Sequence, residues 1–462
     1  MFIPRPGLAS MSPAVKPIVG ALLLAFGAAG AQAQSLTEVV QAARSVDAAY
    51  LGARANADAA HYRYEQSRAL HLPTAGLQIQ AGHQDSTSPT IGVGANNQPA
   101  AVNETIKTNS AGATVNASQN IFNRQNDLSI DQAQKNEDLA QSQLAQADQD
   151  LIVRVAQAYF NVLAATDALT SVQGNSKAIA EQLASAKRNF EVGNSTITDT
   201  REAEARADLA HSQQIAAEND LVVAKVTLDQ LVGRNGVTPH PLILPATLPP
   251  VMPSQASDWV ALAESDNPSL KQARLGLQVA ELDTERAKAG HLPTLVANAT
   301  YGRSRAREEI DGVGTFTGNS RNAGVSVVLN VPLFSGFQIQ NRVNETRALE
   351  QKARTDAEGV HNQVVLGTRT AFVTAQTQAA QVKALEAAEA SSRLALDATT
   401  LGYKVGVKVN LDVLNAQSQL YSTQKDAAGA RYNYLMSQLK LRQAAGELTG
   451  NDLLPIDALL VK

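Results

Sequence analysis

Cysteine is absent from all 462 residues. Without thiols the chain can form no disulfide framework, no zinc–thiolate site and no cysteine nucleophile, and we expect no lipid attached to an N-terminal cysteine. Aromatic residues are also scarce, at 4% of the chain, whereas alanine and glutamine are abundant. This composition is poor material for a thick globular core and favours long, closely packed helices.

The sequence also lacks a strong charge of either sign and any long apolar run after its N-terminal region. Its formal net charge is −4 at pH 7, which argues against a nucleic-acid partner because such proteins present a basic face. No later segment reaches the length of about 20 apolar residues that a transmembrane helix needs. If the chain crosses a membrane, we therefore expect strands to do so.

The N-terminal segment has the three parts of a secretory signal. Arg5 and Lys16 supply positive charge, residues 18–28 form an apolar core, and Ala31-Gln32-Ala33 provides an A-x-A cleavage site. The apolar core is much shorter than a membrane span of about 20 residues. We predict that residues 1–33 are a signal peptide removed after Ala33.

Two parts of the sequence repeat each other. His71-Leu72-Pro73 returns as His291-Leu292-Pro293, and Phe190-Glu191-Val192-Gly193 returns as Tyr403-Lys404-Val405-Gly406. In both copies an aspartate, Asp199 or Asp412, follows six residues after the glycine. A duplication of this length indicates two structural units that complete one another.

The boundaries of the two repeats follow from this pattern. We assign residues 34–233 to the first repeat and residues 259–446 to the second. A proline-rich connector, expected at the equator of the molecule, occupies residues 234–258, and residues 447–462 form a C-terminal tail.

Each repeat predicts a helix, a β-hairpin, a very long helix, a break and a further helix. Apolar and polar residues alternate in the hairpins, expected at 74–121 and 294–332. In the first repeat we expect one opening helix over 35–70 and a loop over 83–108. The long helix over 123–190 would measure about 100 Å at a rise of about 1.5 Å per residue, which is typical of a coiled-coil assembly.

Strands with one apolar and one polar face suit a transmembrane β-barrel, although an ordinary hairpin with one buried face shows the same alternation. Closed barrels begin near 8 strands, so the four strands of one chain cannot close one. We therefore expect several chains to contribute strands. A homotrimer with about twelve strands is the smallest cyclic solution with room for a pore.

At this point the sequence resembles the TolC family of outer-membrane exit ducts, over nearly all of the chain after the signal. The motifs that carry the resemblance are residues 331–336, with Pro332, Leu333, Phe334 and Gly336 where the last strand meets a helix, residues 402–406 followed by 411–414, and residues 430–435. The resemblance implies an α+β membrane protein: a homotrimer whose 12-stranded barrel in the outer membrane of a Gram-negative bacterium continues as a long periplasmic helical tunnel.

The same resemblance implies the partners. A periplasmic adaptor (membrane fusion) protein and an inner-membrane ABC or RND transporter would deliver cargo, outer-membrane lipid would surround the barrel, and neither catalysis nor a cofactor is expected. The lack of a lipid-bearing cysteine fits the branch that serves type I protein secretion and multidrug export. The sequence leaves open which of the two cargo classes this chain exports, and a coiled-coil structural protein without a pore is the alternative reading.

The resemblance places a gate where the paired helices break, at Gly193 and Gly406. A predicted latch consists of Tyr403 and Lys408, with Asp199 and Thr198 as acceptors. Relatives carry arginine at the position of Lys408, and lysine loses the two-pronged geometry of arginine, so we expect a looser latch. The alternative is that Asp199 and Glu202 form a capping box at a helix start.

The resemblance also places acidic rings at the entrance. Asp412 occupies the first ring position, and Asn415 stands where the second ring has an acid. Three carboxylates around a threefold axis would favour cations, whereas the plainer reading is that Asp412 only interacts with the helix dipole. The seven scattered histidines show no metal-ligand spacing.

Overall fold

The computed structural model describes residues 33–93, 98–193, 195–245, 247–311 and 313–461. The predicted signal peptide, apart from Ala33, lies outside these residues. The chain divides into two compact units. Among the described residues, unit 1 comprises those within 33–51, 148–263 and 367–461, and unit 2 comprises those within 52–147 and 264–366.

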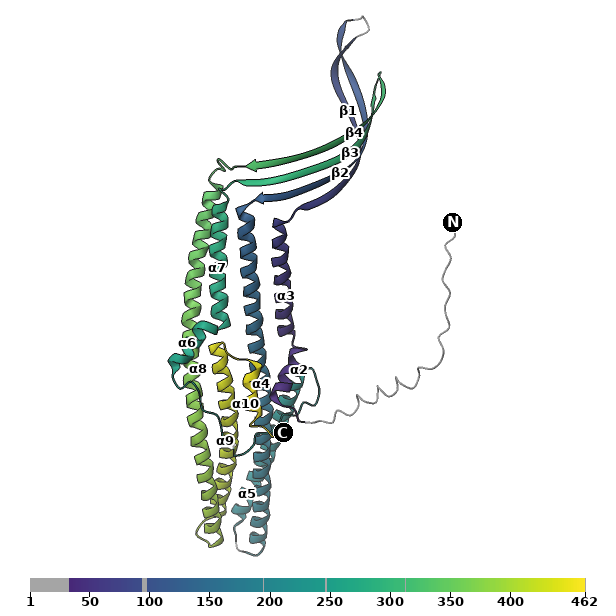
Figure 1. The fold of residues 1–462 in the computed structure, drawn as a ribbon. Helices are drawn as coiled ribbons and strands as arrows, with labels where there is room; N and C mark the ends of the chain where they lie inside the picture. The colour runs from purple at the N-terminus through teal and green to yellow at the C-terminus, as the bar shows by residue number, and fades with distance from the viewer. Residues whose placement is uncertain (1–32, 94–97, 194, 246, 312, 462) are drawn as a thin grey trace, which may run out of the picture. The chain divides into compact units, whose positions relative to one another are not determined.

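Unit 2 contains one antiparallel sheet with the strand order β1-β2-β3-β4 (Figure 1). The strands are β1 (Thr74–Val93), β2 (Pro99–Phe122), β3 (Thr294–Ile310) and β4 (Gly314–Asn330). β2 pairs with β3, so the hairpins of the two repeats join in a single curved sheet. The α+β class is therefore confirmed, with four strands in the described part of the chain.

The first hairpin is longer than the sequence indicates. We expected a loop over 83–108, but residues 83–93 of β1 and 99–108 of β2 are paired in register, with Thr87 opposite Thr105 and Pro89 opposite Asn103. The prediction of a loop is wrong because polar residues on both faces hide the alternation. Pro89 is tolerated because β1 lies at an edge of the described sheet, where one side needs no donor.

The two faces of the sheet differ in polarity. Residues directly opposite one another in neighbouring strands point to the same side, so Leu77, Val115, Tyr301 and Ala323 form one row across the four strands. Alternate residues point to the other face, which carries polar side chains such as Gln78. We call the first of these the apolar face.

Helices of both repeats continue from the strands. They are α3 (Ala48–Arg68), α4 (Arg124–Glu191), α7 (Pro268–Ala289) and α8 (Gln338–Lys404), and the short helix η1 (Ala69–His71) precedes β1. The predicted opening helix over 35–70 is instead two helices, α2 (Leu36–Arg44) and α3. The break occurs because Asp47 accepts a hydrogen bond from the Tyr50 N–H (2.8 Å) and pairs with Arg154 (3.0 Å).

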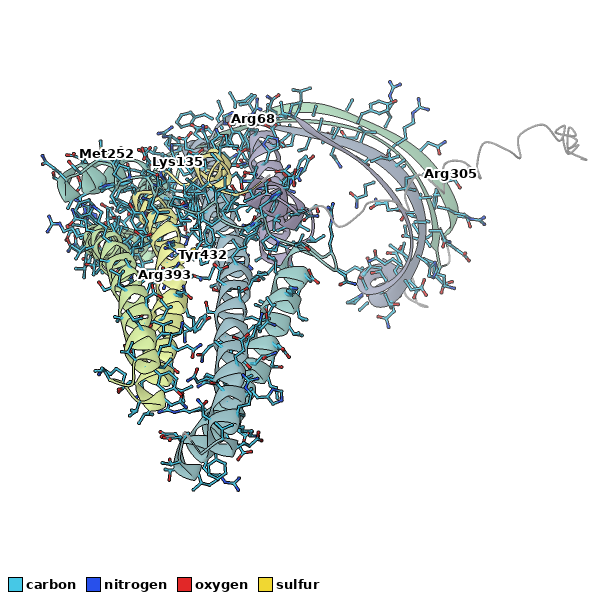
Figure 2. All side chains as sticks on the ribbon, turned by 90° about the horizontal axis from the view of Figure 1, so that it is seen from below. Arg68, Lys135, Met252, Arg305, Arg393 and Tyr432 are labelled. Atoms are coloured by element: carbon cyan, nitrogen blue, oxygen red, sulfur yellow. The ribbon has the colours of Figure 1, made fainter. Side chains whose placement is uncertain are left out.

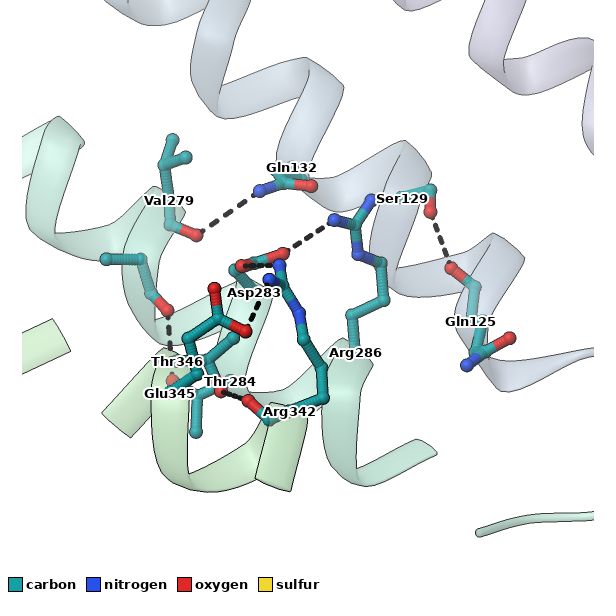
Figure 3. Close-up of polar contacts among 11 residues, drawn as sticks. Gln125, Ser129, Gln132, Val279, Asp283, Thr284, Arg286, Arg342, Glu345 and Thr346 are labelled. Carbon is teal, nitrogen blue, oxygen red and sulfur yellow. Dashed lines mark hydrogen bonds and ion pairs between the residues drawn. The ribbon is translucent and has the colours of Figure 1, made fainter. Parts of the chain in front are cut away.

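A carboxylate joins α7 to the start of α8 in unit 2 (Figure 3). Asp283 pairs with Arg286 at 2.6 Å and with Arg342 at 3.0 Å, and Arg342 also contacts Glu345 at 3.0 Å. The chain turns just before α8, where Gly336 (φ 58°) and Phe337 (φ 61°) have left-handed backbones. The ion pairs therefore hold α8 at the point where the strand-to-helix motif redirects the chain.

The core of unit 1 lies where α2, α4, α5 (Ile197–Val232) and α9 (Asn410–Ala445) meet. Tyr159 and Phe160 are fully buried, and the Phe160 ring stacks on Tyr432 with 6.0 Å between ring centroids. The Tyr432 hydroxyl donates to Asp167 at 2.6 Å. Burial and this carboxylate raise the pKa of Tyr432, so its hydroxyl stays protonated.

Segments far apart in sequence close this core. The first N–H groups of α2, from Leu36 and Thr37, donate to the Asp457 carboxylate at 2.7 and 3.1 Å. Leu242 of the connector forms a β-bridge with Leu460. Two short helices lie here, η2 (Gly450–Leu453) and α10 (Leu454–Asp457), and α6 (Ala256–Asp266) begins at the end of the connector.

Candidate functional site at the helix turns of unit 1

Two helix turns of similar sequence lie at the same end of unit 1 (Figure 1). One joins α4 to α5 and the other joins α8 to α9. Gly193 (φ 79°) and Gly406 (φ 80°) have left-handed backbones there, which glycine adopts readily because it has no Cβ. In the second turn the N–H groups of Val407 and Lys408 donate to the Gly402 carbonyl at 2.9 and 3.1 Å, which is how a glycine ends a helix.

Asp199 caps the start of α5. Its carboxylate accepts hydrogen bonds from the Thr196 N–H (3.0 Å), the Thr196 hydroxyl (2.9 Å) and the Ser195 hydroxyl (2.8 Å). The Asp199 N–H donates back to the Thr196 hydroxyl at 3.1 Å. The capping box is therefore Thr196 with Asp199, and the expected box of Asp199 with Glu202 is wrong, because the helix starts three residues earlier.

These hydrogen bonds set the charge of Asp199. The Thr196 N–H, and after it the two hydroxyls, hold the pKa of this carboxyl below its usual range. Asp199 is consequently an anion at neutral pH, and the partial positive charge of the helix N-terminus favours it further.

The other residues of the predicted latch have different partners. The Tyr403 hydroxyl accepts a hydrogen bond from the Asn189 side chain on α4 at 3.4 Å. The Lys408 ammonium lies 3.6 Å from the Asp412 carboxylate, one turn further along the chain, and Thr198 is exposed. Among the described residues, no hydrogen bond or ion pair joins Asp199 to Tyr403 or Lys408.

Asp412 is held less firmly than its counterpart in the first repeat. The Val409 N–H donates to its carboxylate at 3.4 Å, but Val409 has no side-chain oxygen to return a bond. Only half of a capping box is therefore present at α9, whereas Thr196 completes the box at α5. The Asp412 carboxylate, about two-fifths exposed, remains available to ions near the turn.

Three contacts that the sequence did not reveal link the α4/α5 pair to the α9 side of the turn. Gln182 donates to the buried Asn410 side chain, and Arg206 donates to the Asn415 side chain at 3.2 Å. Leu414 is buried against an apolar cluster of α4 and α5 formed by Ile179, Ala186, Ala203 and Ala210. Gln182 and Asn189 are seven residues apart and so share one face of α4. This spacing is the one feature of the sequence that could have indicated a polar contact surface on α4.

This arrangement holds the two helix pairs together through neutral amides, one hydroxyl, one guanidinium and a small apolar cluster. Such contacts stabilise one position of the helices and can be broken at modest cost, because a typical hydrogen bond contributes only about 0.5–1.5 kcal/mol. In the part of the chain that the structure describes, no group of three or more acidic or histidine side chains could hold a metal. No helix within the same residues is both long and apolar enough to cross a membrane.

Comparison with known proteins identifies the family to which the chain is similar. Residues 39–234 and 259–447 match the outer membrane efflux protein family. The outer membrane protein TolC of Vibrio cholerae is 30% identical over 92% of this chain and 94% of its own length. The alkaline protease secretion protein AprF of Pseudomonas aeruginosa is 31% identical over 68% of this chain and 65% of its own length.

Solved structures share the fold. The outer membrane protein VceC of Vibrio cholerae superposes with a TM-score of 0.70 at 18% sequence identity, covering 89% of this chain and 96% of that one. The two matched ranges of the family also correspond to an internal duplication. The chain therefore belongs to the outer membrane efflux protein family and is an outer-membrane channel-tunnel of the class that serves efflux and type I secretion.

Proposed function

We propose that three copies of this chain form a passive conduit, with the four-stranded sheets closing a barrel of about twelve strands. The observation that carries the proposal is the two-faced sheet, whose apolar face has exposed Leu77, Ile79, Val325 and Val327. A contiguous exposed apolar face on a sheet needs lipid or another protein to cover it. The polar face would line the pore.

The helix turns of unit 1 would form the periplasmic gate. Tyr403, Asn410 and Asn415 contact the α4/α5 pair through Asn189, Gln182 and Arg206, and we assign these contacts to the closed state. Opening would break these contacts. The predicted latch between Asp199 and Lys408 would form only if Lys408 left Asp412. The ion pair between Lys408 and Asp412 is exposed, so breaking it costs little free energy.

An inner-membrane transporter, ABC or RND, and a periplasmic adaptor would deliver the cargo. Relatives are named for both secretion and efflux, since one is an alkaline protease secretion protein and another, CusC, is a cation efflux system protein. We assign cargo choice to the transporter and not to the conduit.

The conduit is tested by its assembly. The full chain should appear in outer-membrane fractions as a trimer that heating converts to a monomer, and it should conduct ions across planar bilayers. Recovery only from the soluble periplasm would contradict the proposal and favour a structural coiled coil.

The partners are tested by crosslinking from the turns. Because the chain has no cysteine, Val192→Cys and Val407→Cys, at two exposed side chains beside the turn glycines, introduce single reactive thiols. Each should capture the adaptor in cells, whereas Met252→Cys, exposed on the connector, serves as the control. Equal capture from Met252→Cys would contradict docking at the turns.

A further inference from the structure

Charge on the sheet changes abruptly along the strands. None of the ranges 74–82, 112–122, 294–302 and 322–330, which adjoin the helices, contains a charged residue. Towards the hairpin tips the first charged residues of β3 and β4 are Arg303 and Arg321, which lie directly opposite each other. The uncharged part of the sheet thus ends at a pair of arginines.

These arginines belong to a cluster, Arg303, Arg305, Arg307 and Arg321, which we call the arginine cluster. The three on β3 are spaced by two residues and therefore point to one side of the sheet. That side is the apolar face, because Tyr301, two residues before Arg303, belongs to the same series. Figure 2 shows Arg305 projecting from the convex side of the curved sheet.

The position of the cluster fits one edge of a membrane. The uncharged segment of β3, Thr294 to Gly302, has nine residues, which span about 30 Å along a strand and about 23 Å when the strand is tilted by about 40°. The apolar band of a transmembrane barrel is about 25 Å tall. The helices begin at the other end of these strands, so the cluster lies at the outer surface of the membrane.

Neighbouring acids do not neutralise the cluster. Glu309 is the next residue of the same face, and its register partner on β2 is Lys107. Asp85 pairs with His83 at 3.0 Å. Among the described residues, no ion pair involves any of the four arginines. Arg303 opposite Arg321 is an unfavourable like-charge pair, which an anion placed between the two guanidinium groups would relieve.

We propose that the arginine cluster binds phosphate groups on the headgroups of the outer-leaflet glycolipid. The guanidinium group contacts phosphate oxygens through two parallel N–H donors, and four such groups on one face can hold a multiply phosphorylated headgroup. Tyr301, just inside the cluster, would lie at the boundary between headgroup and acyl chains, where aromatic side chains gather. This inference rests on the proposed function, because it requires the sheet to cross the outer membrane.

The test uses the full-length trimer in nanodiscs of zwitterionic phospholipid. Diphosphorylated lipid A, or the same glycolipid without phosphates, is added, and lipid retained by the intact trimer is counted by native mass spectrometry. Wild type should retain the phosphorylated form at least about tenfold better, since each arginine near an anionic surface contributes about fivefold. Replacing all four arginines with glutamine should abolish that preference, and replacing all four with lysine should weaken it.

A charge-matched control removes four exposed arginines from helices: Arg54, Arg63, Arg347 and Arg369, each replaced with glutamine. It should retain the phosphorylated lipid as wild type does. If the fourfold cluster variant does not assemble, the pair Arg303→Gln and Arg321→Gln is compared with wild type in its place and should lose most of the preference.

The possible outcomes separate the two proposals. Equal retention of both glycolipids by an inserted wild-type trimer, or unchanged preference in the cluster variants, would overturn the lipid inference alone. Displacement of the lipid by an equal concentration of inorganic phosphate would show that the cluster binds any phosphate and would also overturn it. A wild-type chain that forms no inserted trimer would contradict the proposed conduit, and the lipid site with it.

Discussion

Replacing Asn415 with aspartate tests how the two helix pairs are held together at the gate. Asn415 accepts a hydrogen bond from Arg206 at 3.2 Å, so the new carboxylate would form an ion pair with that guanidinium. The closed state would gain stability, and the carboxylate would be neutralised by Arg206. The exchange therefore strengthens the gate and adds little to the negative charge at the entrance.

The expected size follows from exposure. Asn415 is exposed and Arg206 half-buried, and exposed ion pairs contribute about 0.2–1 kcal/mol each. Three copies in the proposed trimer would add about 0.6–3 kcal/mol, which lowers the open population about 3- to 150-fold. Adding Arg206→Gln removes the partner and should free the carboxylate to attract cations.

Planar-bilayer recordings of wild type, Asn415→Asp, Arg206→Gln and the double variant complete the cycle. Single-channel conductance should fall in Asn415→Asp and rise in Arg206→Gln, and block by multivalent cations should strengthen clearly only in the double variant. If Asn415→Asp alone blocked as strongly as the double variant, Arg206 would not neutralise this position, and the assignment would be wrong.

Three further predictions concern the same turns. Tyr403→Phe removes the acceptor for Asn189 and should raise closed-state conductance, because it weakens the gate by about 0.5–1 kcal/mol per chain. Asn189→Ala should raise the conductance by a similar amount. If the two effects add in the double variant, the residues do not share a hydrogen bond. Gly406→Ala places a Cβ on a residue whose φ is 80° and should destabilise the turn by about 1–2 kcal/mol. Limited proteolysis should then cut the turn faster. Gly359→Ala, where the added Cβ lies in open space on α8, should leave the rate of cleavage unchanged. Hydrogen bonds lower the pKa of Asp199, so its ionised carboxylate stabilises the cap above the unfolded pKa of about 3.9, and this stabilisation is lost as the pH falls through the lower pKa of the folded state. Acid should therefore increase conductance only below about pH 4. A transition between about pH 5 and 7 would implicate another group.

Local patterns predicted the elements of the fold well. Alternation located the strands that start at Thr74 and Thr294, and the long apolar repeat anticipated α4, which ends at Glu191. The break between α2 and α3 escaped notice because Asp47 pairs with Arg154, 107 residues later, which no local pattern encodes. The strand segments 83–93 and 99–108 were missed because pairing with a neighbouring strand, and not burial of one face, maintains them.

The candidate site was predicted less completely. Glycine marked both turns, because a left-handed backbone requires it locally. The partners of Tyr403 and Asn415 depend on how two helix pairs approach each other, which the sequence does not specify. Lys408 illustrates the difference: the resemblance assigned it to Asp199, whereas the closest acid in this structure is Asp412, one turn away. The exchange of Lys408 between these acids stays a prediction.

The contact of α2 with Asp457 bears on how the chain matures. Two of the first backbone donors of this helix are satisfied by a carboxylate 421 and 420 positions later in the sequence. These two hydrogen bonds can therefore form only after the region around Asp457 has been synthesised. Outer-membrane proteins cross the inner membrane before they fold, so these contacts of the unit 1 core cannot form until both segments have crossed.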